Sequence, residues 1–439
     1  MEYSTFTSFN EDSWAGWRAI LDRVTAEVRE LWTVCGRGAG KSRIAALLAA
    51  ITATTKVYKV APGEQIFIAV IAPDRLQARV TFNYCAGLLE SVPASAERII
   101  SRTKHSLTLD NHVVIEVLTA KASAPRGRSY ALVIVEEAAF LPIDTDANPD
   151  KELIRSIGPG LGRVPGSLLV VLSSPYARRG IIYDAWKRHQ ANPDDPTVVF
   201  VKAPTLQLNP THDKRTIEKA YEDDPISAAT EYGAEFRTDV EAFLTLEAIE
   251  ACIEDGVFER PPRSGAGASG KAPTHPTTYR AFLDFAGGSG ADSATLAIAH
   301  ENILDVVREV RPPFKPALVC EDFAKLLKTY GITKATADRY AGQFPVDELK
   351  KHEITLEPSE RSKSEIYRDV LPSINSGSVT LLDNLRLKVQ LQTLERRVAR
   401  GGKDSIDHPP GGHDDIANAV AGALTMAQPA TKIQWGIVW

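Results

Sequence analysis

The segment CGRGAGKS at residues 35–42 constrains the fold of this chain more than any other feature of the sequence. An apolar run at residues 31–35 leads into it, and an Ala/Leu-rich run at residues 41–52 follows, which predicts a strand, a glycine-rich turn and a helix. Glycines let the backbone of such a turn curl until its N–H groups converge, and the helix N-terminus adds a favourable dipole there. The pattern is typical of a phosphate-binding loop.

The loop predicts a site for a nucleoside triphosphate such as ATP together with Mg²⁺. Lys41 is expected to reach the β- and γ-phosphates, and the Ser42 hydroxyl is expected to bind the cation. The backbone contacts are expected from Gly36, Arg37, Gly38, Ala39 and Gly40. The strict pattern has glycine where this chain has Cys35, so Gly36 and Gly38 would supply the flexibility. The alternative is a glycine-rich turn that carries Lys-Ser by chance.

Two carboxylates follow the apolar run ALVIV at residues 131–135. At the end of a strand beside a phosphate loop, one acid can hold Mg²⁺ through water while its neighbour polarises the attacking water. The order predicts Glu136 on the side of the metal and Glu137 as the catalytic base. Aspartate is more usual on the metal side, so Glu136 is a departure from the pattern. The alternative is a strand that simply ends in solvated acids.

Two further segments of this part of the chain are candidates for the same site. Ser173 follows the apolar run at residues 167–172, and a small polar residue there can sense the γ-phosphate or can simply form a polar turn. Arg126 and Arg128 are candidates for an arginine finger, and solvated loop arginines are the alternative reading.

The chain divides into two blocks of different patterning. Residues 261–276, PPRSGAGASGKAPTHP, lack large apolar residues and predict a linker between a domain at residues 1–260 and one at residues 277–428, followed by a tail at residues 429–439. In the first block we expect helices at residues 41–52 and 76–89 and strands at residues 31–35, 65–72, 106–109, 113–118, 131–135 and 167–172. This alternation predicts an α/β sheet with helices on both sides.

The second block begins with strands joined by short turns, at residues 280–285, 294–300 and 304–310, which predicts an antiparallel meander. Short strands are then expected at residues 334–338 and 379–382, and helices at residues 323–330, 346–352, 363–374 and 385–400. A meander followed by β-α-β units predicts a mixed sheet.

Carboxylates stand at strand ends and at a helix start of this second block. Asp284 and Asp338 each end an expected strand, and Asp414 and Asp415 begin a helix in GGHDDI. At one edge of a sheet, such residues can hold two Mg²⁺ or Mn²⁺ ions, which stabilise the attacking and leaving oxygens when a phosphodiester is cleaved. His413 is a candidate for contact with the scissile phosphate, and an exposed residue of a Pro/Gly-rich loop is the alternative reading. The alternatives are turn residues for Asp284 and Asp338, and a helix cap and dipole partner for Asp414 and Asp415.

Composition limits the setting of the protein more than its chemistry. The formal net charge is −5, so any nucleic-acid site must be a local basic surface. The 4 cysteines lie far apart, which argues against a zinc site or a disulfide framework. The N-terminal residues have no secretory signal pattern, and no apolar run has membrane-spanning length, so we expect an intracellular protein that is not secreted.

Taken in order, these segments resemble one family. The motifs CGRGAGKS, LVIVEEAAF, LLVVLSSP, FLDFAGGSGADSATLAI, TADRY and GHDDIANAVA are similar to those of the large terminase subunit of tailed bacteriophages, over about residues 31–427. The resemblance implies an additional-strand, RecA-like ATPase domain and an RNase H-like nuclease domain. By it, Asp284, Asp338 and Asp415 are the nuclease acids, with Asp414 as a replacement for Asp415 or an addition to it.

The same resemblance implies a DNA-packaging motor. Its partners would be double-stranded DNA, a portal protein, a small terminase subunit and like copies in a ring, with no membrane. It would work in the host bacterial cytoplasm and transiently on the procapsid. Two rivals remain open from the sequence: a repair or recombination helicase-nuclease, and a nucleotide-switched scaffold whose nuclease acids are vestigial.

Overall fold

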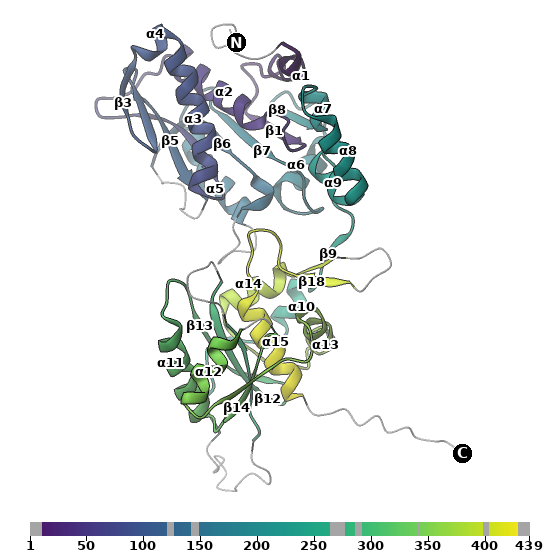
Figure 1. Ribbon diagram of the computed structural model, residues 1–439. Coiled ribbons are helices and arrows are strands. Elements are labelled where there is room, and N and C mark those ends of the chain that lie inside the picture. The colour runs from purple at the N-terminus through teal and green to yellow at the C-terminus, as the bar shows by residue number, and fades with distance from the viewer. Residues whose placement is uncertain are drawn as a thin grey trace. The chain divides into compact units, whose positions relative to one another are not determined.

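The computed structural model describes residues 11–120, 127–141, 149–263, 277–285, 292–339, 342–397 and 404–428 (Figure 1). The chain divides into two compact units: Met1–Pro142 with Asn148–Thr238, and Ile143–Ala147 with Asp239–Trp439. Most of the expected linker, residues 264–276, and the expected tail, residues 429–439, lie outside the described residues.

The first unit ends earlier than the sequence predicts. The expected boundary was residue 260, whereas the compact units divide at Thr238. Ile249 and Cys252 are buried in a core cluster of the second unit. Strand β10 (Ile253–Glu254) pairs with β16 (Leu381–Leu382) of that unit. Residues 239–260 therefore belong to the second unit. The sequence did not predict this, because their partners lie more than a hundred residues later in the chain.

The first unit is built on one eight-stranded sheet, in the order β3-β4-β5-β2-β6-β7-β1-β8. All neighbours from β5 to β8 are parallel, and the β3-β4 and β4-β5 pairs are antiparallel. The strands are β1 (Glu30–Cys35), β2 (Ile66–Ala72), β3 (Ile99–Arg102), β4 (Ser106–Leu109), β5 (Val113–Thr119), β6 (Ser129–Val135), β7 (Leu168–Ser173) and β8 (Val198–Ala203). Because β7 lies between β1 and β6, the expected additional-strand arrangement is confirmed.

Helices cover both faces of this sheet, and alternate strand residues serve the two layers. Leu31 is buried in the cluster that includes α2 (Lys41–Thr55) and α3 (Arg75–Ser91). Its neighbour Trp32 is buried in the cluster that includes α5 (Pro149–Leu161) and α6 (Gly180–Ala191). The remaining helices are α1 (Glu11–Leu21), α4 (Pro93–Ala96), η2 (Ala138–Phe140), α7 (Thr205–Leu208), α8 (Lys214–Asp223) and α9 (Pro225–Glu231).

The second unit holds a five-stranded mixed sheet, in the order β13-β12-β11-β14-β15. Strand β12 is antiparallel to both neighbours, while β14 and β15 run parallel to β11. The strands are β11 (Arg280–Asp284), β12 (Ala294–His300), β13 (Ile303–Val310), β14 (Lys334–Ala337) and β15 (Thr355–Pro358). The meander followed by parallel strands confirms the expected RNase H-like class.

Two helical layers also flank this sheet (Figure 1). Leu283 belongs to the core cluster of α11 (Pro316–Thr329) and α12 (Gln343–Lys351). Phe282 belongs to the cluster of α13 (Lys363–Asn375), α14 (Leu385–Thr393) and α15 (Asp415–Ala427), together with α10 (Leu246–Glu250). Side chains that follow the direction of Phe282 therefore face α15, and Asp284 is the next of these.

The helix expected at residues 385–400 is wrong in its second half. It ends at Thr393, and the chain continues into β17 (Glu395–Arg397). That strand pairs antiparallel with β18 (Ser405–Asp407) and with β9 (Val240–Ala242). The partner β9 is far away in the sequence, so local periodicity could not reveal the strand. Among the described residues, no helix is long and apolar enough to cross a membrane.

Candidate active sites

The glycine-rich loop joins the end of β1 to the start of α2, as expected. A Cβ atom at Gly36 would lie 2.3 Å from Thr205 Oγ1 and 2.5 Å from the Tyr232 carbonyl oxygen, so only glycine fits there. Gly40 has a φ of 92°, a left-handed conformation that side chains disfavour. The loop therefore owes its shape to glycines at a close approach and at a sharp entry into the helix.

Lys41 is held against the start of this loop. Its side chain is buried, and its Nζ donates to the carbonyl oxygens of Cys35 at 2.9 Å and Gly36 at 3.2 Å, and to Ser174 Oγ at 3.2 Å. These acceptors fix the ammonium beside the loop backbone, where the phosphates of a nucleotide are expected. Burial raises the pKa of the neighbouring Cys35 thiol to about 12, so this cysteine is a neutral packing residue.

Ser42 and Glu136 lie together, as a shared Mg²⁺ site requires. The Ser42 hydroxyl donates to Glu136 Oε2 at 2.9 Å, and the Thr81 hydroxyl donates to Glu136 Oε1. Glu136 is 3% exposed, and burial raises the pKa of its carboxyl group. A buried carboxylate beside a hydroxyl offers the hard oxygen ligands that Mg²⁺ prefers, so these residues fit the cation. Thr81 carries no sequence signal, because its partner lies 55 residues later.

Glu137 has a different setting from Glu136. Its backbone is left-handed, with a φ of 47°, at the sharp turn after β6. Its Oε2 accepts from the Ser174 backbone N–H at 3.4 Å. Ser174 also contacts Lys41, so it joins the phosphate loop to Glu137. After this turn, Glu137 lies half-buried beside Ser174, whereas Glu136 is buried.

Ser173, the expected γ-phosphate sensor, is fully buried, and its Oγ accepts from the Ala139 backbone N–H at 3.1 Å. The structure thus places Ser174, the next residue of the same small polar segment, between Lys41 and Glu137. Of the arginine candidates, Arg126 lies outside the described residues. Arg128 forms an ion pair with Glu116 and stacks over the Phe67 ring at 4.5 Å from its centroid.

A segment late in the first unit also holds the phosphate loop. The Thr205 hydroxyl donates to the Arg37 carbonyl oxygen at 2.8 Å, and Asn209 Nδ2 donates to the Gly38 carbonyl oxygen at 2.9 Å. From the other end of the unit, Trp17 Nε1 donates to the Ala39 carbonyl oxygen at 2.7 Å. None of these residues was predicted, since each bond joins segments that are distant in the sequence.

A second site lies at the carboxyl ends of two neighbouring parallel strands. Asp284 ends β11, and Asp338 directly follows β14, whose last residue pairs with Leu283. The two carboxylates share one partner. Asn418 Nδ2, on α15, donates to Asp284 Oδ2 at 2.7 Å and to Asp338 Oδ2 at 3.0 Å. The structure therefore brings these two predicted acids together, by way of an asparagine that sequence reasoning missed.

The two acids at the start of α15 have different partners. Asp414 accepts from the Tyr367 hydroxyl at 2.9 Å and forms an ion pair of 3.1 Å with Lys363. It makes no side-chain cap bond to the helix. Asp415 accepts from the Ser293 backbone N–H at 3.1 Å. Because Lys363 already neutralises Asp414, Asp415 is the better candidate for a cation ligand.

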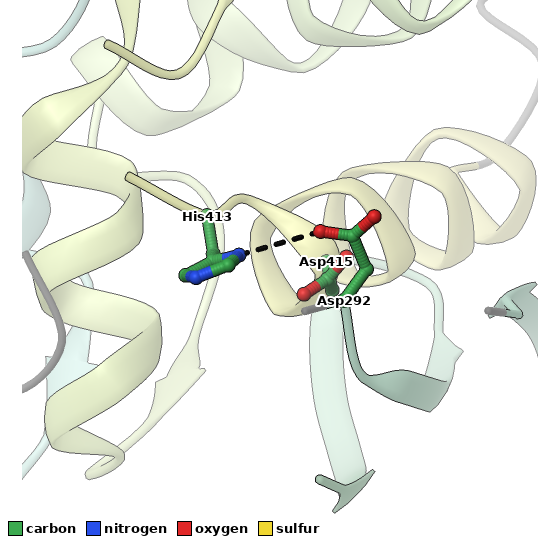
Figure 2. Close-up of side chains that lie close together, drawn as sticks. All are labelled: Asp292, His413 and Asp415. Carbon is green, nitrogen blue, oxygen red and sulfur yellow. Dashed lines mark ion pairs between the residues drawn. The ribbon is translucent and has the colours of Figure 1, made fainter. Parts of the chain in front are cut away.

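Figure 2 shows Asp415 with Asp292 and His413, gathered at the N-terminus of α15. One ligand atom of each lies within 4.8 Å of the others, and His413 Nδ1 is 3.4 Å from Asp292 Oδ1. A similar group contains Asp407, His408 and Asp414, but Lys363 pairs with both of its acids. Within the described ranges, Asp284 and Asp338 belong to neither group. Asp292 was not predicted.

The acids of the second site nevertheless raise one another's pKa values. Burial, together with the charges of Asp415, Asp338 and Asp414, raises the pKa of Asp284 to about 8, against the hydrogen bond from Asn418. Burial, with Asp292 and Asp414 nearby, raises the pKa of Asp415 to about 6. Buried carboxylates that repel one another in this way fit a site for Mg²⁺ or Mn²⁺, whose charge would relieve the repulsion.

The raised pKa values of Asp284 and Asp415 predict that the stability of the fold depends on pH. The folded Asp284 and Asp415 bind protons more tightly than in the unfolded chain, so metal-free protein should lose stability as the pH rises from about 5 to about 8. Mg²⁺ should therefore raise the melting temperature more at the upper end of this range than at the lower end. Differential scanning calorimetry with and without Mg²⁺ measures both effects. In Asp284→Asn, the pH dependence should be smaller; an unchanged slope would contradict the assignment.

Comparison with known proteins gives one family match and several similar structures. Residues 33–147 match a family model described as RNA cytidine acetyltransferase NAT10/TcmA, helicase domain. No curated protein matches the sequence. Among solved structures, the large terminase of bacteriophage HK97 is 17% identical, with 96% of this chain and 95% of that chain covered and a TM-score of 0.43.

Solved domains match the two halves separately. The large terminase ATPase domain of Thermus phage P74-26 is 17% identical, with 53% of this chain and 96% of that chain covered and a TM-score of 0.39. The large terminase nuclease of thermophilic phage G20c with bound magnesium is 16% identical, with 42% and 98% covered and a TM-score of 0.33. The chain is similar to large terminases.

Proposed function

We propose that this protein is the large subunit of a viral DNA-packaging terminase. Its first unit would hydrolyse ATP to move double-stranded DNA into a procapsid, and its second unit would cut concatemeric DNA. The observation that carries the first part is the bond between Ser42 and Glu136, with Lys41 buried beside it. The second part rests on Asp284 and Asp338, which meet at one sheet edge within the same chain.

In the ATPase site, the loop amides and Lys41 would bind the phosphates of ATP. Mg²⁺ held by Ser42 and Glu136 would neutralise charge that develops on the β- and γ-oxygens. Glu137 would orient the attacking water and take its proton. Ser174 would keep Glu137 beside Lys41, since it contacts both residues. This division of labour explains why two adjacent glutamates occupy such different settings.

Glu137→Gln should therefore separate binding from hydrolysis. We expect ATP affinity to stay within a few-fold of wild type, while kcat falls about 10²–10⁴-fold, the usual contribution of a positioned base. Equilibrium titration with a fluorescent ATP analogue and steady-state phosphate release measure the two quantities. Glu90→Gln is the matched control, because Glu90 is an exposed acid on α3 paired with Arg102. If Glu137→Gln hydrolysed ATP at the wild-type rate, Glu137 would not be the catalytic base.

In the nuclease site, Asp284, Asp338 and Asp415 would hold two Mg²⁺ or Mn²⁺ ions. These ions would supply an activated water and stabilise the leaving oxygen of the cleaved phosphodiester. His413, which is part exposed beside Asp415, would contact the scissile phosphate. Lys363 would keep Asp414 neutralised and so fix the start of α15.

The partners follow from this function. They are double-stranded DNA, a portal protein, a small terminase subunit and further copies of this chain in a ring on the procapsid, in the host bacterial cytoplasm. With a net charge of −5, the protein should bind DNA through local contacts to phosphates, so binding should weaken steeply with salt.

A helicase-nuclease is the second candidate, because the matching family model at residues 33–147 describes a helicase domain. The two functions differ in their action on duplex DNA. When ATP is hydrolysed, a helicase separates the strands of a forked duplex and releases its labelled strand. A packaging motor leaves the strands paired, and this is the result that we expect from a strand-displacement assay.

A further inference from the structure

Asn418 occupies the centre of the second site, although neither the sequence patterns nor the metal-ligand groups single it out. It lies one turn into α15 and is 1% exposed. Its Nδ2 donates to Asp284 Oδ2 at 2.7 Å and to Asp338 Oδ2 at 3.0 Å. One amide group therefore uses both of its N–H donors on carboxylates from two different strands.

The orientation of this amide is fixed by chemistry. If Oδ1 and Nδ2 were exchanged, the carbonyl oxygen would face two acceptors, which is repulsive. In the described part of the chain, Oδ1 is buried and has no hydrogen-bond donor. A buried acceptor without a partner costs about 1–3 kcal/mol. A side chain kept at such a cost in an otherwise Ala-rich helix indicates a function other than packing.

The geometry also explains why the amide suits this place. Asp284 and Asp338 follow residues that pair in register on neighbouring strands, so their carboxylates would repel each other without a shared donor. A leucine would supply no donor, and an aspartate would add another negative charge. A neutral side chain with two donors in one plane bonds both carboxylates without adding charge, and it leaves their remaining oxygens for a ligand.

We propose that Asn418 is a positioning residue that holds Asp284 and Asp338 at a fixed spacing for a divalent cation. The proposal rests on the nuclease function proposed above. Groups that orient metal ligands without touching the metal typically change metal affinity about 10–100-fold when they are replaced. Asn418 acts through both strand-end acids at once, so it sets the geometry of the site before any cation binds.

The test is the affinity of the full-length chain for Mn²⁺, measured by isothermal titration calorimetry without nucleotide. Asn418→Leu should weaken Mn²⁺ binding about 10–100-fold. Asn418→Ala, which removes the amide without adding bulk, should do the same and serves if the leucine variant fails to fold. Gln390→Leu is the matched control: this buried amide accepts from the Ala417 backbone N–H and contacts neither acid. It should change the melting temperature but not the Mn²⁺ affinity.

Asp284→Asn, measured in parallel, separates the two possible failures. If Asp284→Asn binds Mn²⁺ as tightly as wild type, the cation site itself is wrongly assigned and the nuclease proposal fails. If Asp284→Asn loses binding while both Asn418 variants stay within twofold of wild type, the nuclease site stands and the positioning role of Asn418 is overturned.

Discussion

Lys41→Ala is expected to lower the kcat of ATP hydrolysis at least about 100-fold, because it removes a buried positive charge beside the loop where we propose that the transferred phosphate binds. The ammonium is fixed by the carbonyl oxygens of Cys35 and Gly36 and by Ser174, so no other lysine of the described structure can take its place beside the loop. Phosphate release at saturating ATP measures the effect. Lys41→Met, which keeps the length of the side chain, should be equally inactive.

Lys56→Ala is the control for this experiment. Lys56 caps the other end of the same helix, where its Nζ donates to the Gly166 carbonyl oxygen at 2.7 Å. It should retain kcat within about twofold, because its charge lies a full helix length from the loop. An active Lys41→Ala protein would show that residues 35–42 are only a glycine-rich turn.

Asp284→Ala is expected to abolish cation-dependent cutting of plasmid DNA, with a loss of at least about 100-fold in rate. The substitution removes one carboxylate from the cluster of Asp284, Asp338 and Asp415. It also leaves Asn418 with one of its two partners. ATP hydrolysis should be unchanged, since no residue of the phosphate loop contributes to this cluster. The conversion of supercoiled plasmid to open-circular and linear forms, in Mg²⁺ and in Mn²⁺, measures the effect.

The matched acid for this prediction is Asp369. It is part exposed on α13 and forms an ion pair of 2.8 Å with Arg361. Asp369→Ala should cut DNA at the wild-type rate, which would exclude a general effect of lost negative charge. If Asp284→Ala cut DNA at the wild-type rate, the proposed nuclease site of the second unit would be wrong.

The sequence predicts those parts of the sites that are coded by neighbouring residues. The glycine-rich loop, Lys41 and Ser42 lie within eight positions of one another, between a strand and a helix that also have local signals. Glu136 and Glu137 are recognisable because they end a continuous apolar strand. For the same reason, six of the eight strands of the first sheet and the meander of the second unit could be predicted from apolar runs and turns, whereas β3 and β8 were missed.

The residues that complete each site could not be predicted, because their partners are distant in the chain. Thr81 bonds Glu136, Asn209 bonds Gly38 and Asn418 bonds Asp338, each across dozens of residues or more. An isolated threonine or asparagine carries no signal of such a contact. The true start of the second unit was missed for a related reason: β9 and β10 are short strands whose partners come from the far end of the chain.

The charge balance of the second site also could not be predicted from the sequence. From the sequence, only the resemblance favoured Asp415, and Asp414 stayed open as a replacement or an addition. Lys363 decides between them, because its Nζ lies 2.6 Å from Asp407 and 3.1 Å from Asp414. Nothing in the spacing of Lys363 relative to the acids predicts this ion pair.

If one chain carries two separable catalytic centres, a single reaction should distinguish them. Wild type, Lys41→Ala and Asp284→Ala are incubated with ATP, Mg²⁺ and supercoiled plasmid, and phosphate release and DNA cutting are followed in the same reaction. We expect Asp284→Ala to release phosphate but leave the plasmid intact, and Lys41→Ala to release none while its nuclease centre still cuts. Loss of both activities in both variants, or cutting by Asp284→Ala at the wild-type rate, would contradict it.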